Sequence, residues 1–464
     1  MNTFGLAGML TRARLRARSG TGVLDVLAVV AFSFSSWLTL TTLGGVYMFW
    51  HNTDAVNAAV ASRFGEGILN DGLGQSYFAL AVVALALLTV PLLSLGGAAA
   101  RLGAGGRERR LASLRLIGMS SRQVLGMSVL ESVLQASLGF VIGLVAYFGS
   151  LPAWKMLTFG TLPINPSQML LPWWALCATF FLMAVIAALS TVIGLQRVSI
   201  SPLGVAHRII PPSVKMWRMA VLAATLVGVL YMTSLFSPSQ VAVGQIISIG
   251  VTFLLFIGGI SFAGPLLIQL TMRPLVLTSS PALLVGIRRV VSDSRGAWRN
   301  ISAIALMGVV ATLASTLSFV TLSQDVDSTG ASIQEMIAHD IRQGVMIAFA
   351  FALIIGAVST LIHQSSDVFD RAGEARTLVH VGTPVTTLIR ARFIQVLLPL
   401  VAVSAILVAL SLLPALANPV LNNWSNLNVM GVMILSGLVL TALSVAVTIP
   451  IQYQVVYERV RRND

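Results

Sequence analysis

Charge and cysteine are both scarce in this sequence, and each shortage excludes a class of protein. Only 10% of the 464 residues are Asp, Glu, Lys or Arg, whereas soluble domains carry roughly 25%. A chain of this length therefore lacks the polar surface of a water-soluble protein. The single cysteine, Cys177, cannot form a disulfide within the chain, and the five scattered histidines lack the spacing of metal ligands. We predict no metal site.

The sequence also lacks the motifs that hold phosphate or carry out hydrolysis. Its only lysines are Lys155 and Lys215, and neither lies in a P-loop of the form GxxxxGK[ST]. The HExxH and GxSxG motifs are absent as well. We therefore expect that the chain is not an enzyme, has no catalytic residues and binds no cofactor of its own.

Long apolar segments are what the chain does contain, with 56% hydrophobic residues. A helix needs roughly 20 apolar residues to cross the hydrocarbon core of a membrane. The length of the segments and the absence of two-residue alternation favour helices over barrel strands. The ten predicted spans are about 26–50, 77–99, 124–149, 169–194, 217–236, 246–270, 301–322, 344–362, 393–413 and 428–450. We predict an all-α polytopic membrane protein.

The basic residues alternate with these spans and predict the orientation of the chain. Of the 29 Lys and Arg residues, 26 lie in the two terminal segments and four alternate loops, while the other loops hold only Arg63, Lys155 and Arg342. The positive-inside rule then places both termini in the cytoplasm. Because the basic residues flank apolar spans, the net charge of +13 favours anionic lipid and a cytoplasmic protein as partners over nucleic acid.

The ten spans divide into groups of four, two and four, which predicts two related halves around a central pair. We expect an amphipathic interfacial segment at 1–23, a first permease-like half at 24–210, a central pair with a linker at 211–299 and a second half at 300–464. The outer loops are too short for a domain with its own core.

A weak internal repeat relates the two halves. Segment 108–131 aligns with segment 372–395 at a shift of 264 residues, which places Gly118 on Gly382 and Glu131 on Gln395. Internal repeats of this kind are common in transporters.

The basic segment before the third span carries ordered apolar positions. Leu111, Leu114 and Ile117 recur at helical spacing, Gly118 supplies a stop, and Ser120 can cap the next helix. A loop that only fixes topology is the simpler interpretation, but charge alone does not explain the apolar positions. A short helix joined by a tight turn to a span can transmit force from a soluble partner.

The sequence from Glu108 to Leu144 resembles the signature of the FtsX/MacB-like permease domain of ABC transporters, and Ser201-Pro202-Leu203 resembles that domain's closing segment. The ten-span layout is similar to bacitracin-export-type permeases, without their large outer domain between spans seven and eight. The resemblance implies a bacterial cytoplasmic membrane protein on which two ABC-type ATPase subunits dock. ATP and Mg²⁺ would then bind those subunits.

The resemblance further implies two coupling helices, at about 107–118 and 371–382, that insert into grooves on the ATPase subunits. In the first helix the implied residues are Glu108, Arg109, Arg110, Leu111, Leu114, Arg115, Ile117 and Gly118. The second copy keeps Arg371, Glu374, Leu378, Gly382 and Pro384. It departs from the first at Val379 and Thr386, which align with Arg115 and Arg122.

Glu131 is the candidate polar residue within a predicted span. Either it takes part in function, as buried membrane carboxylates often do, or it lies near enough to the headgroups to stay solvated and to hold the coupling turn. Its depth of about 10 Å along the helix favours the second interpretation.

Three functions remain open at this point. The leading hypothesis is a permease subunit that exports or extracts an amphiphile, such as an antimicrobial peptide, a lipid or a hydrophobic drug. The alternative is a relay without transport, which would control an outer hydrolase or a sensor kinase through an additional membrane or extracellular partner. An ion-coupled secondary transporter is less consistent with the sequence, because it requires several charges at mid-membrane.

Overall fold

The computed structural model describes residues 21–64, 73–105, 120–159, 162–199, 215–234, 243–316, 328–417 and 427–457. Three predictions lie largely or wholly outside these residues: the interfacial segment at 1–23, the first coupling helix at 107–118 and the Ser-Pro-Leu element.

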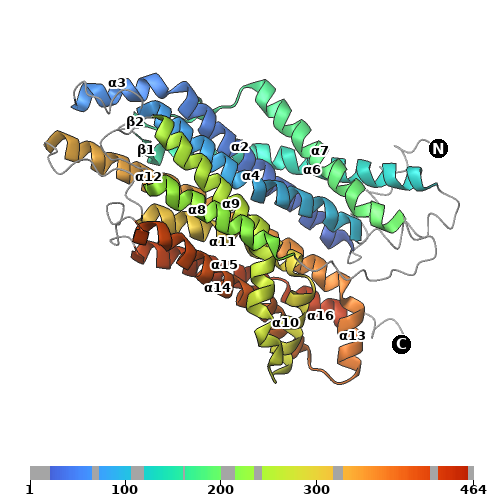
Figure 1. Cartoon of the computed structure of the whole chain (residues 1–464). Coiled ribbons are helices and arrows are strands. Elements are labelled where there is room, and N and C mark those ends of the chain that lie inside the picture. The colour runs from blue at the N-terminus through green and yellow to red at the C-terminus, as the bar shows by residue number, and fades with distance from the viewer. Residues whose placement is uncertain are drawn as a thin grey trace.

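Long helices lying roughly side by side form the body of the molecule (Figure 1). The first half contributes α2 (Thr21–His51), α4 (Leu73–Gly105), α6 (Ser121–Ser150) and α7 (Trp173–Ser199). The central pair is α8 (Trp217–Ser234) and α9 (Val243–Met272). The second half contributes α11 (Ser294–Thr316), α12 (Ser328–Asp370), α14 (Val385–Ala417) and α15 (Leu427–Ala446).

Shorter elements cover the two ends of this bundle. We call the end where α2 begins and α12 ends the inner end, because the distribution of basic residues predicts that it faces the cytoplasm. It carries η3 (Pro274–Leu277), α10 (Pro281–Ser292), α13 (Ala372–His380) and α16 (Ile449–Tyr457). The outer end carries α3 (Thr53–Phe64), η1 (Leu151–Met156), η2 (Pro166–Met169) and an antiparallel hairpin of β1 (Thr158–Phe159) and β2 (Leu162–Pro163), with Phe159 opposite Leu162.

Eight described helical segments are long and apolar enough to cross a membrane, which confirms an all-α, multi-pass membrane protein. They coincide with eight of the ten predicted spans. Helices α8 and α11 occupy the other two positions, and α8 contributes a shorter apolar segment, Trp217–Met232. The count of ten spans and the 4+2+4 grouping stay predictions.

Two outer segments that we expected to be loops contain helix instead. Within 51–76, residues Thr53–Phe64 form α3, and within 323–343 the chain already enters α12 at Ser328. Hydropathy does not detect these helices, because they mix polar and apolar residues and are stabilised by packing. At 1.5 Å per residue, the 43 residues of α12 extend about 65 Å, well beyond the roughly 30 Å hydrocarbon core.

Glycines allow α6 to lie directly against α2. A Cβ atom at Gly139 would lie 2.4 Å from Phe32 Cβ, and one at Gly143 would lie 2.7 Å from the Ser33 carbonyl oxygen. Small residues permit this close approach of helix backbones in membrane proteins. The G-x-x-x-G spacing in α6 therefore serves packing within the chain.

Helix α12 joins the two halves through contacts with α4 and α2. Phe349, Phe351 and Ile355 of α12 belong to the same buried cluster as Leu88 and Leu95 of α4. At the outer end, the hydroxyl group of Tyr77 in α4 donates a hydrogen bond of 2.6 Å to Asp340 Oδ2 in α12. Helix α12 therefore contacts the first half both in this buried cluster and at the outer end.

Candidate functional site

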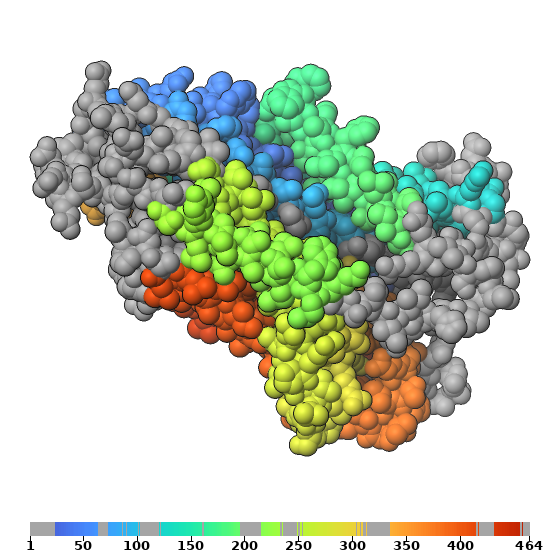
Figure 2. Space-filling view, viewed as in Figure 1, coloured from blue at the N-terminus to red at the C-terminus, as the bar shows by residue number. Residues whose placement is uncertain are grey.

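Two short helices, α10 and α13, cross the inner end of the bundle at a steep angle to the long helices (Figure 1). Figure 2 shows them next to each other, projecting from the body of the molecule. We call α10, α13 and the turn at 381–384 the inner platform. It includes the segment in which we predicted the second coupling helix.

The boundaries of α13 follow from two backbone breaks. Arg371 leaves the helical conformation, with φ −102° and ψ 15°, so the chain changes direction after α12. At the other end Gly382 has φ +99°. The Thr383 amide donates to the Leu378 carbonyl oxygen at 2.9 Å, and the Gly382 amide donates to that of Val379 at 3.0 Å. These two bonds form a Schellman motif, which favours glycine at the left-handed position.

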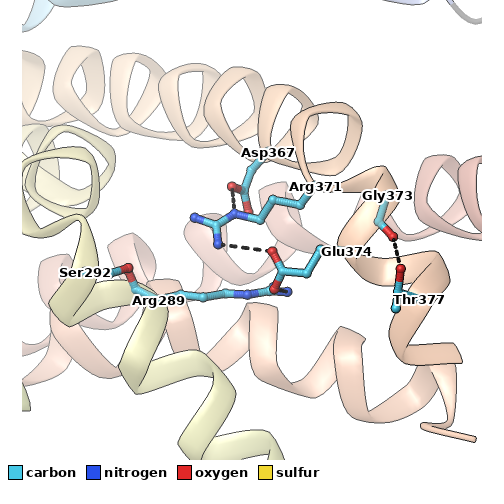
Figure 3. Close-up of polar contacts among 7 residues, drawn as sticks. All are labelled: Arg289, Ser292, Asp367, Arg371, Gly373, Glu374 and Thr377. Atoms are coloured by element: carbon cyan, nitrogen blue, oxygen red, sulfur yellow. Dashed lines mark hydrogen bonds and ion pairs between the residues drawn. The ribbon is translucent and has the colours of Figure 1, made fainter. Parts of the chain in front are cut away.

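A carboxylate of α13 is held between two arginines, as Figure 3 shows. Glu374 Oε1 accepts from Arg289 Nη2 of α10 at 3.0 Å, and Glu374 Oε2 lies 3.8 Å from Arg371 Nη1. Arg371 Nε in turn donates to Asp367 of α12. Burial alone would lower the pKa of Arg371, but the carboxylates of Asp367 and Glu374 outweigh it and raise that pKa. Through these pairs α13 is attached to both α10 and α12.

Sequence analysis missed α10 as the neighbour of α13. The sequence does contain a pattern that predicts this helix, because Leu284, Ile287 and Val291 recur at helical spacing after Pro281. We had read the arginines of this loop only as a topology signal. The helix packs tightly on α14, since a Cβ atom at Gly286 would lie 2.8 Å from the Ala391 carbonyl oxygen.

The turn after α13 forms the exposed tip of the inner platform. The Val381 side chain is 80% exposed, and Gly382 and Pro384 are also exposed, while Leu378 is half-buried. The five predicted residues of the second copy therefore separate into two groups. Arg371 and Glu374 bind groups within the chain, whereas Leu378, Gly382 and Pro384 lie at or near the tip.

In the first half, the predicted cap at the start of α6 is confirmed. The Gln123 amide donates to Ser120 Oγ at 3.3 Å, and the Ser120 amide donates to Gln123 Oε1 at 3.0 Å. This reciprocal pair is a capping box. The predicted coupling residues before it, from Glu108 to Gly118, lie outside the described residues.

Glu131 lies in a buried polar layer at the inner end of the first half. Its exposed fraction is 9%, and the neighbouring Ser132 accepts a hydrogen bond of 2.8 Å from Thr191 of α7. One turn farther along α6, Gln135 donates to Asp25 Oδ1 at 3.0 Å near the start of α2. The structure thus places Glu131 closer to the inner end than the Asp25 contact. We call Asp25, Glu131, Ser132, Gln135 and Thr191 the first polar layer.

Comparison with known proteins gives one family match. Residues 78–203 match the family model described as FtsX-like permease C-terminal. A search of curated proteins found no match to the chain. The matched segment contains most of α4, all of α6 and α7, and the predicted first coupling helix.

Proposed function

We propose that this chain, whose residues 78–203 match the FtsX-like permease family model, is the membrane subunit of an ABC transporter driven by a separate ATPase. The family match carries the proposal, because proteins of this family usually work with such an ATPase. The inner platform supports it further. A short helix with an exposed apolar tip, set at the end of a long helix, is suited to receive force from a soluble protein.

In this proposal, ATP binding closes the two ATPase subunits and displaces the coupling segments at 107–118 and 371–382. Motion of α13 passes to α12 through Arg371 and Asp367, and to α10 through Glu374 and Arg289. The Schellman turn passes it to α14. Since α12 packs on α4 and α2 as far as the Tyr77–Asp340 hydrogen bond, the same motion reaches the first half and the outer end.

The proposed substrate is an amphiphile taken from the membrane, such as an antimicrobial peptide, a lipid or a hydrophobic drug. The outer elements in the described part of the chain are short helices and a two-stranded hairpin. Elements of this size favour a substrate that is reached from the bilayer over one captured by a large outer domain. If ATP hydrolysis is tightly coupled but unaffected by amphiphiles, the relay without transport is the better description.

Site-specific photo-crosslinking tests the proposal. A photoreactive residue at Val381, in the exposed tip, is expected to cross-link a P-loop ATPase that is co-expressed with the chain. A matched probe at Met156, which is 89% exposed at the outer end, is expected to give no such product. Labelling of position 381 from outside intact cells would contradict the proposal, and so would ATP hydrolysis by the purified chain alone.

A further inference from the structure

Three arginines from different elements line one small hollow at the inner end. They are Arg289 of α10, Arg371 between α12 and α13, and Arg392 of α14, and Gln452 of α16 lies beside them. The cavity volume of the hollow is about 10 Å³, which holds about one water molecule, and the hollow opens to solvent. Only a small group, or the end of a larger ligand, would enter it.

One of these arginines has no salt bridge within the described part of the chain. Asp367 and Glu374 pair with Arg371 and Arg289, whereas no carboxylate of the described residues lies within salt-bridge distance of Arg392. Arg392 is only 5% exposed, and its Nε and Nη1 atoms have no hydrogen-bond partner among the described residues. Burial of this guanidinium is costly, because the attraction of Asp367 is opposed by repulsion from Arg289 and Arg371. An anion in the hollow would remove this cost.

The hollow lies at the level expected for the inner headgroups of the membrane. Arg392 is two turns into α14, within the apolar segment Val385–Leu413. Next to α10, the side chains of Leu275 and Leu277 are 43% and 93% exposed. Exposed apolar residues beside a cluster of arginines are typical of the membrane–water interface. Basic pockets between helices on the cytoplasmic side commonly bind lipid headgroups.

We propose that Arg392, together with Arg289 and Arg371, binds a phosphate group at the inner membrane surface. Guanidinium groups bind phosphate through paired N–H donors, and Arg392, which lines the hollow, has two nitrogen atoms without a hydrogen-bond partner among the described residues. The phosphate belongs either to an anionic phospholipid or to a soluble phosphate compound. The proposal does not depend on coupling to an ATPase, so either one can fail without the other.

The unfolding temperature of the full chain in nanodiscs tests this site. Phosphatidylglycerol is expected to raise the midpoint of the wild type relative to phosphatidylcholine alone, since a ligand that binds the folded state stabilises it. Arg392→Gln is expected to lose this shift and to retain phosphatidylglycerol at least about tenfold less tightly. The matched control is Arg288→Gln, which removes an exposed charge from α10 and is expected to behave as the wild type.

A second measurement separates binding from a structural role of Arg392. In phosphatidylcholine alone, Arg392→Gln is expected to unfold at the same temperature as the wild type or higher, because it removes a buried charge that has no salt bridge among the described residues. Stabilisation by inorganic phosphate in place of phosphatidylglycerol would identify a soluble ligand. If neither probe distinguishes wild type from Arg392→Gln, or if the variant is destabilised in phosphatidylcholine, the proposed site is overturned and water fills the hollow.

Discussion

The inner ends of the two halves differ in their buried and half-buried charged side chains. In the first half, the first polar layer contains the carboxylates of Asp25 and Glu131. In the second half, the repeat shift of 264 residues places Arg392 on Ser128 and Gln395 on Glu131. A carboxylate of the first half is thus replaced by an amide, and an arginine is added beside the ion pairs of Asp367 and Glu374 in the second half. The aligned inner segments of the two halves therefore differ in their electrostatics.

The turns into the spans also differ between the halves, although both join to a long helix. The first uses a serine cap, Ser120 with Gln123, at the start of α6. The second has Pro384 where the first has Ser120, and it relies on the Schellman bonds at Gly382. The starts of α6 and α14 therefore use different local chemistry.

The largest expected effect comes from giving the first half a packing residue of the second half. Gly139 aligns with Val403 under the same shift. Gly139→Val, which introduces the residue of the second half, is expected to push α6 away from α2, because the added Cβ atom would lie 2.4 Å from Phe32 Cβ. We expect a loss of about 3 kcal/mol of unfolding free energy, measured by thermal unfolding in detergent.

Gly126→Val on the same helix is the matched control, since no atom lies within 4 Å of a Cβ built there. It is expected to unfold within a few degrees of the wild type. Equal destabilisation by both variants would show that helix propensity, and not the contact with α2, accounts for the loss.

A charge exchange in the inner platform has a smaller expected effect. Glu374 aligns with Arg110, so Glu374→Arg gives the second half the residue of the first. It is expected to detach α13 from α10 at a cost of about 2 kcal/mol, because Arg289 is left buried beside a like charge. The exposure of Glu374, 37%, keeps the cost below that of a fully buried pair. Hydrogen exchange of the α13 amides measures the change.

The reversed pair is the control for this exchange. Arg289→Glu combined with Glu374→Arg restores an attraction between α10 and α13 and is expected to recover most of the lost protection. If the double variant is no better protected than Glu374→Arg alone, the Arg289–Glu374 pair does not hold the inner platform together.

The spans were predictable from the sequence for a physical reason that does not extend to the inner platform. A membrane span must be apolar over about 20 residues, so hydropathy locates α2, α4 and α9 without knowledge of their neighbours. Helices such as α3 and α10 need no apolar run, because packing stabilises them.

The charged residues were harder to predict than the spans. The positive-inside rule predicts that Arg289 and Arg392 lie on the cytoplasmic side. It depends only on the number of basic residues and carries no information on the direction of a side chain. The sequence therefore could not show that both are buried. The contact of Glu374 with a partner stays a prediction. The sequence did not show that Glu374 also accepts a hydrogen bond from Arg289, which lies 85 residues earlier in the chain.

Substitution of the glycine that ends α13 has the smallest expected effect. The same substitution can be made at the aligned glycine of the first half. Gly382→Ala is expected to cost about 1 kcal/mol, because alanine is strained at φ +99°. Gly373→Ala is the control, since no atom lies within 4 Å of a Cβ built at that exposed position of α13. If the first coupling helix ends as the second does, Gly118→Ala will show a matching loss in hydrogen-exchange protection of the preceding residues. A neutral Gly118→Ala beside a destabilising Gly382→Ala would show that the repeat does not extend to this turn.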